Sequence, residues 1–221
     1  MILQIENLTF GWQKEPLFEN ISCQFHSNEI IQLSGENGSG KTTLLHLISG
    51  LIPHFSRGEI LTGEIFLDKR SILKEPPKSF FPKIAFIPGM NLDFFLLTES
   101  LRQEILLTRA TLKLDKNRFN ERSDKFSNFF PGLKEFMDMP FKQMQIAHKI
   151  IALTFIYYLQ NAQLFLFDEV MTTFSESKTQ QWYSFFEWLG SKGCIAIFVN
   201  HHQQVEQFSQ YTLKDKKLVK I

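Results

Sequence analysis

Short runs of apolar residues divide the chain into segments that predict strands and helices. Residues 30–33, 164–167 and 194–199 are apolar almost throughout, which is typical of parallel strands buried on both faces of a sheet. Residues 41–51 follow the first run and carry leucines and Ile48 at helical spacing. Alternation of such strands with helices predicts an α/β fold with a mainly parallel sheet.

The order of the segments predicts one domain, residues 1–221, with two lobes. Residues 1–88 and 161–221 contain the predicted strands, and the N-terminal strands are expected to form an antiparallel part. Residues 89–160 are interpreted as a mainly helical sub-domain whose first helix is capped at residues 98–100. A chain of 221 residues is near the upper size for a single core.

Phenylalanines mark two places in the predicted helical sub-domain. Phe126, Phe129 and Phe130 recur at i, i+3 and i+4 and therefore share one helical face. We interpret this face as core; the alternative is a docking surface, because 24 phenylalanines exceed what a core of this size needs. For the apolar cluster at residues 94–97 we favour docking on a partner.

The segment between the first apolar run and the following helix predicts a phosphate-binding loop. Residues 35–42, Gly-Glu-Asn-Gly-Ser-Gly-Lys-Thr, match G-x-x-x-x-G-K-[ST] at every fixed position. Glycines let successive backbone N–H groups turn toward phosphates, and the start of the helix adds partial positive charge. Lys41 is expected to neutralise phosphate oxygens, and the Thr42 hydroxyl is expected to bind Mg²⁺. The predicted nucleotide-binding residues here are Gly35, Asn37, Gly38, Ser39, Gly40, Lys41, Thr42 and Thr43.

Two downstream strands end in residues that suit the same site. The second apolar run is followed by Asp168, a predicted Mg²⁺ ligand, and Glu169, predicted to orient or deprotonate the attacking water. His201 comes just past the third run, where open α/β sheets bind ligands, and is predicted to contact the γ-phosphate. Lys41, Glu169 and His201 form the predicted catalytic set of a P-loop ATPase.

In this order the motifs resemble those of the ATP-binding cassette (ABC) ATPases, over the whole chain. Residues 1–10 alternate like an edge strand, and Trp12 stands where the family has an aromatic that stacks on adenine. The phosphate loop, Asp168-Glu169 and His201 follow at family spacing. The resemblance implies an ATPase subunit that uses ATP and Mg²⁺, pairs with a second ABC ATPase or with itself, and energises a transmembrane transporter subunit. It implies a cytoplasmic protein at the inner face of the cell membrane.

Two further segments resemble the subgroup that serves energy-coupling-factor importers of vitamins and metals. One runs from residues 50–54 to residues 63–68, and the other covers residues 91–98 and is similar to the stretch after that subgroup's glutamine loop.

Three family features are missing. The family has a glutamine after Ile87-Pro88, where this chain has Gly89. The Leu-Ser-Gly-Gly-Gln signature corresponds to residues 144–148 or, in another register, to residues 139–143, and neither segment contains a serine or a glycine. The loop after Glu169, residues 172–175, lacks the family's aspartate.

The missing signature implies two unequal sites in a dimer. In the family the signature offers a serine hydroxyl and glycine N–H groups to the γ-phosphate of ATP on the second subunit, and the backbone must approach closely. Ile146 or Phe141 would place carbon there, at a cost of kcal/mol size for each lost charge-assisted bond. The phosphate loop of this chain is therefore expected to work with an intact signature from a partner, whereas its own signature region is not expected to support hydrolysis.

Two function classes remain open. The first is the energy-transducing ATPase of a transporter, favoured by Glu169 and His201, and the second is a regulatory protein that binds ATP with little turnover, favoured by Gly89 and the missing signature. A GTPase should show an Asn-Lys-x-Asp guanine reader, which is absent. The net charge of +1 gives no electrostatic case for nucleic acid.

Apolar runs and cysteines in the sequence indicate the cellular environment in which the protein works. No uncharged apolar run approaches eighteen residues, so no transmembrane helix is expected. The first residues read directly as a predicted strand, so no signal peptide is expected. Cys23 and Cys194 are expected to pack as small hydrophobic residues rather than to pair, which fits a reducing compartment.

Overall fold

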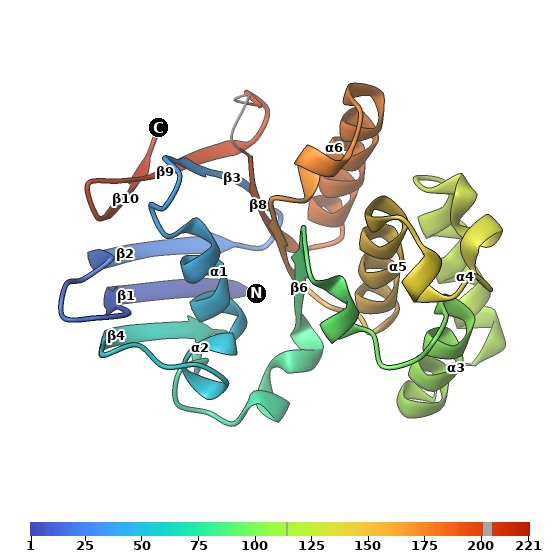
Figure 1. Ribbon diagram of the computed structural model, residues 1–221, viewed down its shortest axis with the longest axis horizontal. Helices are drawn as coiled ribbons and strands as arrows, with labels where there is room; N and C mark the ends of the chain where they lie inside the picture. Colours follow the sequence, from blue (N-terminus) through green and yellow to red (C-terminus); the bar gives the residue numbers. More distant parts are fainter. Residues whose placement is uncertain (114, 201–204) are drawn as a thin grey trace.

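The computed structural model describes residues 1–113, 115–200 and 205–221. These residues form two sheets with helices between and beside them, and the predicted α/β class is confirmed (Figure 1). Within the described ranges no helix is long and apolar enough to cross a membrane.

The larger sheet has six strands in the order β10-β9-β3-β8-β7-β6. Five neighbouring strands run parallel, and only β10 pairs with β9 in the antiparallel sense. The strands are β3 (Ile30–Gly35), β6 (Ile84–Pro88), β7 (Leu164–Asp168), β8 (Ile195–Val199), β9 (Ser209–Lys214) and β10 (Lys217–Lys220). The apolar runs of the sequence therefore form its central strands, as predicted.

The central strands are buried on both faces because each contributes to two cores. In β7, Phe165 and Phe167 pack into one hydrophobic cluster, whereas Leu164 and Leu166 pack into the other. Successive side chains of a strand point to opposite faces, so a run of four apolar residues supplies both cores at once.

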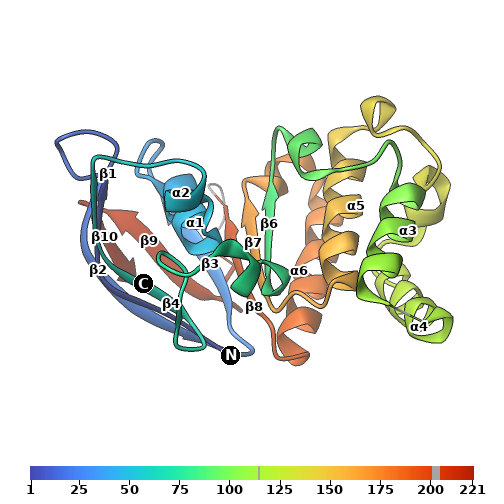
Figure 2. The same cartoon turned by 90° about the horizontal axis from the view of Figure 1, so that it is seen from below.

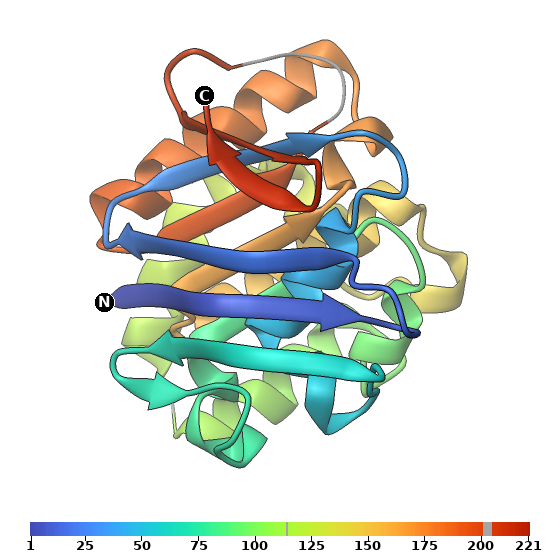
Figure 3. The same ribbon diagram turned by 90° about the vertical axis from the view of Figure 1, so that its left-hand side faces the viewer.

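The smaller sheet is antiparallel, in the order β2-β1-β4-β5. Its strands are β1 (Ile2–Gly11), β2 (Phe18–His26), β4 (Ile60–Leu67) and β5 (Arg70–Ser71). The interpretation of residues 1–10 as an edge strand is wrong, because β1 lies between β2 and β4 (Figure 3). The alternation of β1 arises because one face of the strand is buried, with Leu3, Ile5 and Leu8 pointing inward. Such alternation does not show whether a strand has neighbours on one side or on both.

The helices occupy two layers around the larger sheet (Figure 2). Helix α1 lies between the two sheets and packs its leucines into the cluster that they share. Helices α5 and α6 cover the opposite face, and α3 and α4 lie beyond α5 (Figures 1 and 2). The helices are α1 (Lys41–Ser49), α2 (Leu51–His54), α3 (Leu101–Leu112), α4 (Lys116–Ser127), α5 (Ile146–Leu159) and α6 (Glu176–Ser191).

Short 3₁₀ turns connect these elements. They are η1 (Pro77–Ser79), η2 (Phe81–Lys83), η3 (Leu92–Phe95), η4 (Pro131–Phe136), η5 (Phe141–Gln143) and η6 (Val170–Thr173). The cap predicted at residues 98–100 is Ser100, whose hydroxyl accepts a hydrogen bond from the Gln103 N–H at 3.5 Å.

The phenylalanine cluster at the end of α4 is core, as we interpreted it. Phe126 is fully buried, and its ring lies 4.8 Å from that of Phe130 and 4.9 Å from that of Phe155 on α5. Phe129 packs on Phe185 and is partly buried. Aromatic contacts of this kind tie α4 and α5 to α6.

Candidate nucleotide-binding site

The phosphate loop lies where the chain leaves β3 and enters α1, at the carboxyl edge of the larger sheet. All three of its glycines, Gly35, Gly38 and Gly40, have a positive φ. A Cβ on Gly40 would lie 2.7 Å from the ring of Phe18 and 2.8 Å from Leu17. Only glycine fits this position, because both the backbone angle and the space exclude a side chain.

A cavity of about 280 Å³ opens over this loop. Trp12, from the turn between β1 and β2, and Glu169, which follows β7, both line it. The lining residues are Trp12, Leu17, Asn37, Gly38, Gly40, Lys41, Thr42, Thr43 and Glu169. The structure thus brings together most of the predicted nucleotide-binding residues with one predicted catalytic carboxylate.

Lys41 is held inside the loop. Its Nζ donates hydrogen bonds to the carbonyl oxygens of Gly35 and Glu36, each at 2.9 Å. Burial lowers the pKa of Lys41, and the negative charges of Glu169 and Asp168 act in the opposite direction. A partly desolvated ammonium gains more from an anion than an exposed one does, which suits a phosphate ligand.

Asp168 and Thr42 meet at the same place. The Thr42 hydroxyl donates to Asp168 Oδ1 at 3.1 Å, and Asp168 is only 8% exposed. The described residues contain no group of three or more His, Cys, Asp or Glu side chains able to hold a metal. One hydroxyl and one carboxylate are enough for Mg²⁺ when phosphates and water molecules supply the remaining ligands.

The loop also has features that a phosphate would satisfy. The Ser39 hydroxyl is buried and has no hydrogen-bond partner among the described residues. A Cβ placed on Gly38 would meet no atom within 4 Å, so open space lies beside the backbone there. A buried polar group without a partner is costly, and a phosphate oxygen beside the loop would supply one.

Glu169 directly follows the last strand residue of β7. Its backbone is left-handed, with φ of 56° and ψ of 20°, and its carbonyl oxygen accepts from the Thr172 hydroxyl at 2.8 Å. His201 lies outside the described residues. The last described residue before it, Asn200, is buried and donates to the Tyr183 hydroxyl at 3.2 Å.

The region of the missing signature is the start of α5. Gln145 is the N-cap residue, without a side-chain cap bond, and α5 begins at Ile146, which is 49% exposed. His148 stacks on Phe136 at 4.5 Å, and Lys149 forms an ion pair with Asp93 at 2.7 Å. Segment 144–148 thus spans a helix start, whereas segment 139–143 precedes it and ends in the 3₁₀ turn η5.

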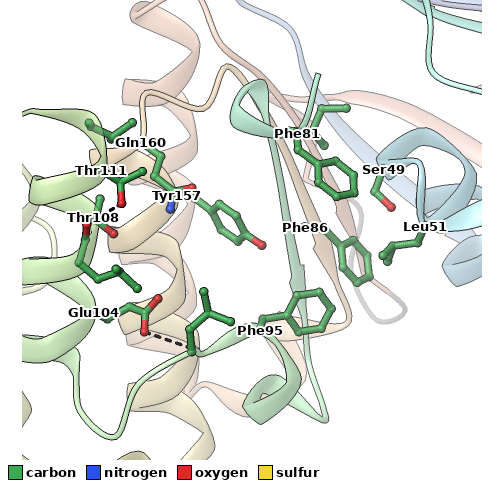
Figure 4. Close-up of a pocket in the computed structure, with 14 residues that line it drawn as sticks. Ser49, Leu51, Phe81, Phe86, Phe95, Glu104, Thr108, Thr111, Tyr157 and Gln160 are labelled. Carbon is green, nitrogen blue, oxygen red and sulfur yellow. Dashed lines mark hydrogen bonds between the residues drawn. The ribbon is translucent and has the colours of Figure 1, made fainter. Parts of the chain in front are cut away.

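A second cavity, which sequence reasoning did not predict, lies between the strand region and the helices. This groove of about 430 Å³ is mostly apolar (Figure 4). Its lining residues are Ser49, Leu51, Phe81, Ile84, Phe86, Phe95, Leu97, Glu104, Leu107, Thr108, Thr111, Leu112, Tyr157 and Gln160. Of these, only Phe95 and Leu97 belong to the cluster that we interpreted as a docking segment.

Polar groups in this groove come from α1, α3 and α5 and from Gln160, which directly follows α5. Glu104 on α3 is 4% exposed, and its Oε2 accepts from the Leu97 N–H at 3.1 Å and from the Thr98 N–H at 3.0 Å. Burial, and then the nearby Glu104 carboxylate, raises the pKa of Tyr157 to about 12. Figure 4 shows the Tyr157 side chain reaching from α5 toward Phe86. Sequence patterns could not identify Glu104 and Tyr157 as parts of one site, because the two residues lie far apart in the chain and come together only in the folded protein.

Comparison with known families identifies one match. A family model described as ABC transporter matches residues 18–210. The cytochrome c biogenesis ATP-binding export protein CcmA of Vibrio cholerae is 28% identical over 203 residues, which are 90% of this chain and 91% of that protein. The ribose import ATP-binding protein RbsA of Lactococcus lactis is 25% identical over 92% of this chain.

Some relatives are much longer than this chain. A putative ABC transporter ATP-binding protein of Bacillus thuringiensis subsp. konkukian is 26% identical over 90% of this chain, but the match covers 34% of its own length. The match to the ribose import protein likewise covers only 41% of that protein's length.

Solved structures show the same fold. An ATP-binding subunit of an ABC transporter has a TM-score of 0.83 and 19% identity, over 100% of this chain and 90% of that one. The cbiO1 protein of Clostridium perfringens, described as part of the ABC transporter complex cbiONQ, has a TM-score of 0.78 and 16% identity. It covers 98% of this chain and 86% of its own, and at these identities the likeness concerns the fold alone.

Proposed function

Because the chain belongs to the ABC transporter family of ATP-binding proteins, we propose that it is the ATP-hydrolysing subunit of a transporter. Members of this family generally bind ATP with Mg²⁺, hydrolyse it and pair with transmembrane subunits. The observation that carries the proposal is the single cavity in which Trp12, Lys41, Thr42 and Glu169 meet. A protein that only binds ATP has no need of a carboxylate beside the phosphates.

Each residue has a defined task in this proposal. Trp12 stacks on adenine, and the loop N–H groups and Lys41 hold the phosphates. Thr42 and Asp168 hold Mg²⁺, which supplies charge neutralisation at the phosphates when bound. Glu169 orients the attacking water or accepts its proton, and His201 contacts the γ-phosphate.

The start of α5 leads us to propose an asymmetric pair with a second ABC ATPase. Ile146 exposes carbon where the family offers glycine N–H groups, so the partner's nucleotide finds few donors there. Losing one preorganised donor to a developing charge costs about 10²–10³ in rate. We therefore assign turnover to ATP on this chain's phosphate loop, completed by the partner's intact signature.

The groove is the proposed contact with the membrane subunit. Phe94 and Leu97 are 85% and 79% exposed beside it, and a cluster of large exposed apolar side chains is typical of a protein–protein interface. In this arrangement the protein lies at the inner face of the cell membrane. The subgroup of energy-coupling-factor importers is our proposal for its relatives, supported by residues 50–54, 63–68 and 91–98 and by a fold shared with cbiO1.

The test is to purify the chain through an affinity tag from its native membranes in mild detergent. We expect a polytopic membrane protein and a second ABC ATPase with a Leu-Ser-Gly-Gly-Gln segment, identified by mass spectrometry. The isolated chain should hydrolyse ATP poorly even when concentrated, because both sites of a homodimer would lack the signature. Steady turnover near 1 s⁻¹ from the pure chain, lost in Glu169→Gln, would refute the asymmetric pair.

The alternative is a regulatory protein that binds ATP with little or no hydrolysis. Gly89 in place of the family's glutamine and Ile146 at the start of α5 favour it. Recovery of the chain with itself alone, together with ATP binding but no turnover in any preparation, would support this alternative over the transporter subunit.

A further inference from the structure

Gly89 directly follows β6 and touches the residues of the proposed reaction centre. Its N–H donates to the Asp168 carbonyl oxygen at 2.7 Å, which continues the parallel pairing of β6 with β7 by one more bond. A Cβ on Gly89 would lie 3.0 Å from the Asp168 carbonyl oxygen and 3.1 Å from the Glu169 carbonyl oxygen. The φ of Gly89 is not in the left-handed region, so the constraint on a side chain at this position comes from the space beside it and not from the backbone conformation.

Glu169 sits in a backbone conformation that needs support. Its φ of 56° lies in the left-handed region, which costs a residue with a Cβ about 1–2 kcal/mol. The carbonyl oxygen of the preceding residue, Asp168, accepts a hydrogen bond from the Gly89 N–H. The carbonyl oxygen of Glu169 itself accepts one from the Thr172 hydroxyl at 2.8 Å. The peptide groups on both sides of Glu169 are therefore fixed by hydrogen bonds from Gly89 and Thr172.

We propose that Gly89 and Thr172 are positioning residues that set the direction of the Glu169 side chain. In this view Gly89 is adapted to the close approach of β6 to the Asp168-Glu169 segment, rather than being only the site of a lost glutamine. The inference rests on the proposed function, in which Glu169 acts on the attacking water.

The expected effect follows from the distances. A side chain at position 89 must push the Asp168-Glu169 backbone away by a few tenths of an ångström, since contacts of 3.0–3.2 Å are tighter than a Cβ normally makes. A misplacement of about 1 Å at a reacting group costs roughly 10²-fold in rate, so we expect turnover to fall roughly three- to tenfold. The affinity for ATP should not change, because Trp12 and the phosphate loop are untouched.

The experiment measures kcat and ATP affinity in the complex purified through a tag on this chain. Gly89→Ala and Gly89→Gln should both lower kcat and leave the Kd for a fluorescent ATP analogue within twofold. Thr172→Ala should lower kcat as well, and Thr172→Ser, which keeps the hydroxyl, should restore it. Gly132→Ala is the matched control, because its nearest neighbour is the flexible Glu135 side chain at 3.8 Å, and its kcat should not change.

Glu169→Gln distinguishes a failure of the positioning role from a failure of the proposed ATPase function. If it removes turnover while Gly89→Gln raises or preserves kcat, the positioning role is wrong and the proposed function stands. If Glu169→Gln leaves turnover unchanged, both are wrong. A loss of kcat in Gly89→Ala accompanied by an equal loss in Gly132→Ala, or by weaker ATP binding, would also overturn the positioning role, because the effect would then be general damage to the fold.

Discussion

Trp12 offers a direct test of the proposed nucleotide-binding site. The side chain is 42% exposed at the edge of the cavity over the phosphate loop, and its ring meets Phe10 edge-on, with centroids 5.0 Å apart. The contact with Phe10 thus helps to hold the indole in place, while its exposed part remains available to a base. Removal of an aromatic partner from a stacked base costs about 1–3 kcal/mol.

Trp12→Ala should accordingly raise the Kd for Mg·ATP roughly 5- to 150-fold, since about 1.4 kcal/mol corresponds to a tenfold change. Trp12→Phe keeps a flat ring and should lose much less. Because Trp12 is half exposed, the free energy of unfolding should change by no more than about 1 kcal/mol, or a Tm shift of about 2–4 °C. The Tm separates loss of stacking from loss of fold.

Isothermal titration of each variant with Mg·ATP supplies the numbers, and Lys41→Ala serves as the variant that removes phosphate contacts. An unchanged Kd in Trp12→Ala, together with a large loss in Lys41→Ala, would refute the stacking role. The adenine would then lie elsewhere, although the phosphate loop would keep its assignment.

Three further predictions concern the core, the pH response and the groove. Phe126→Ala should lower the free energy of unfolding, measured by urea titration, by about 3–5 kcal/mol, because it leaves a cavity at a fully buried position. Phe126→Leu leaves a smaller cavity and should lower the free energy of unfolding clearly less. Equal losses in the two variants would contradict the role of cavity volume. Burial lowers the pKa of His46, so the folded protein resists a proton that the unfolded chain accepts, and stability should fall as the pH drops below the ordinary histidine value. His46→Gln should flatten that loss between pH 7 and pH 5, and an identical pH profile would rule the histidine out. Leu97→Asp should prevent recovery of the membrane subunit while leaving ATP affinity unchanged, because it puts a charge on the apolar rim of the groove; full recovery would exclude this rim from the contact.

The sequence predicts those parts of the protein whose determinants are local. The phosphate loop is a contiguous pattern, and Asp168 and Glu169 follow an apolar run typical of a strand buried on both faces, which β7 is. Residues 1–10 show the limit of such patterns. Their alternation identifies the buried face of β1 but not its two neighbours, which pair through backbone groups that all residues share.

Other features depend on pairs that are distant in sequence. The groove joins Glu104 on α3 to Tyr157 on α5, and neither residue is marked within its own helix. Gly89 could be recognised from sequence as a departure from the family, but its close approach to the Asp168 carbonyl is a property of strand pairing. The composition of a segment does not give the distance between two backbones.

The measurement that tests the account most directly compares two glutamate variants in the assembled complex. One is Glu169→Gln in this chain, and the other is the matching change in the second ABC ATPase. We predict that Glu169→Gln removes most of the ATPase activity of the complex, because it disables the site that the partner's signature completes, whereas the matching change has little effect. Equal losses from the two changes would contradict an assembly with one active site on the phosphate loop of this chain.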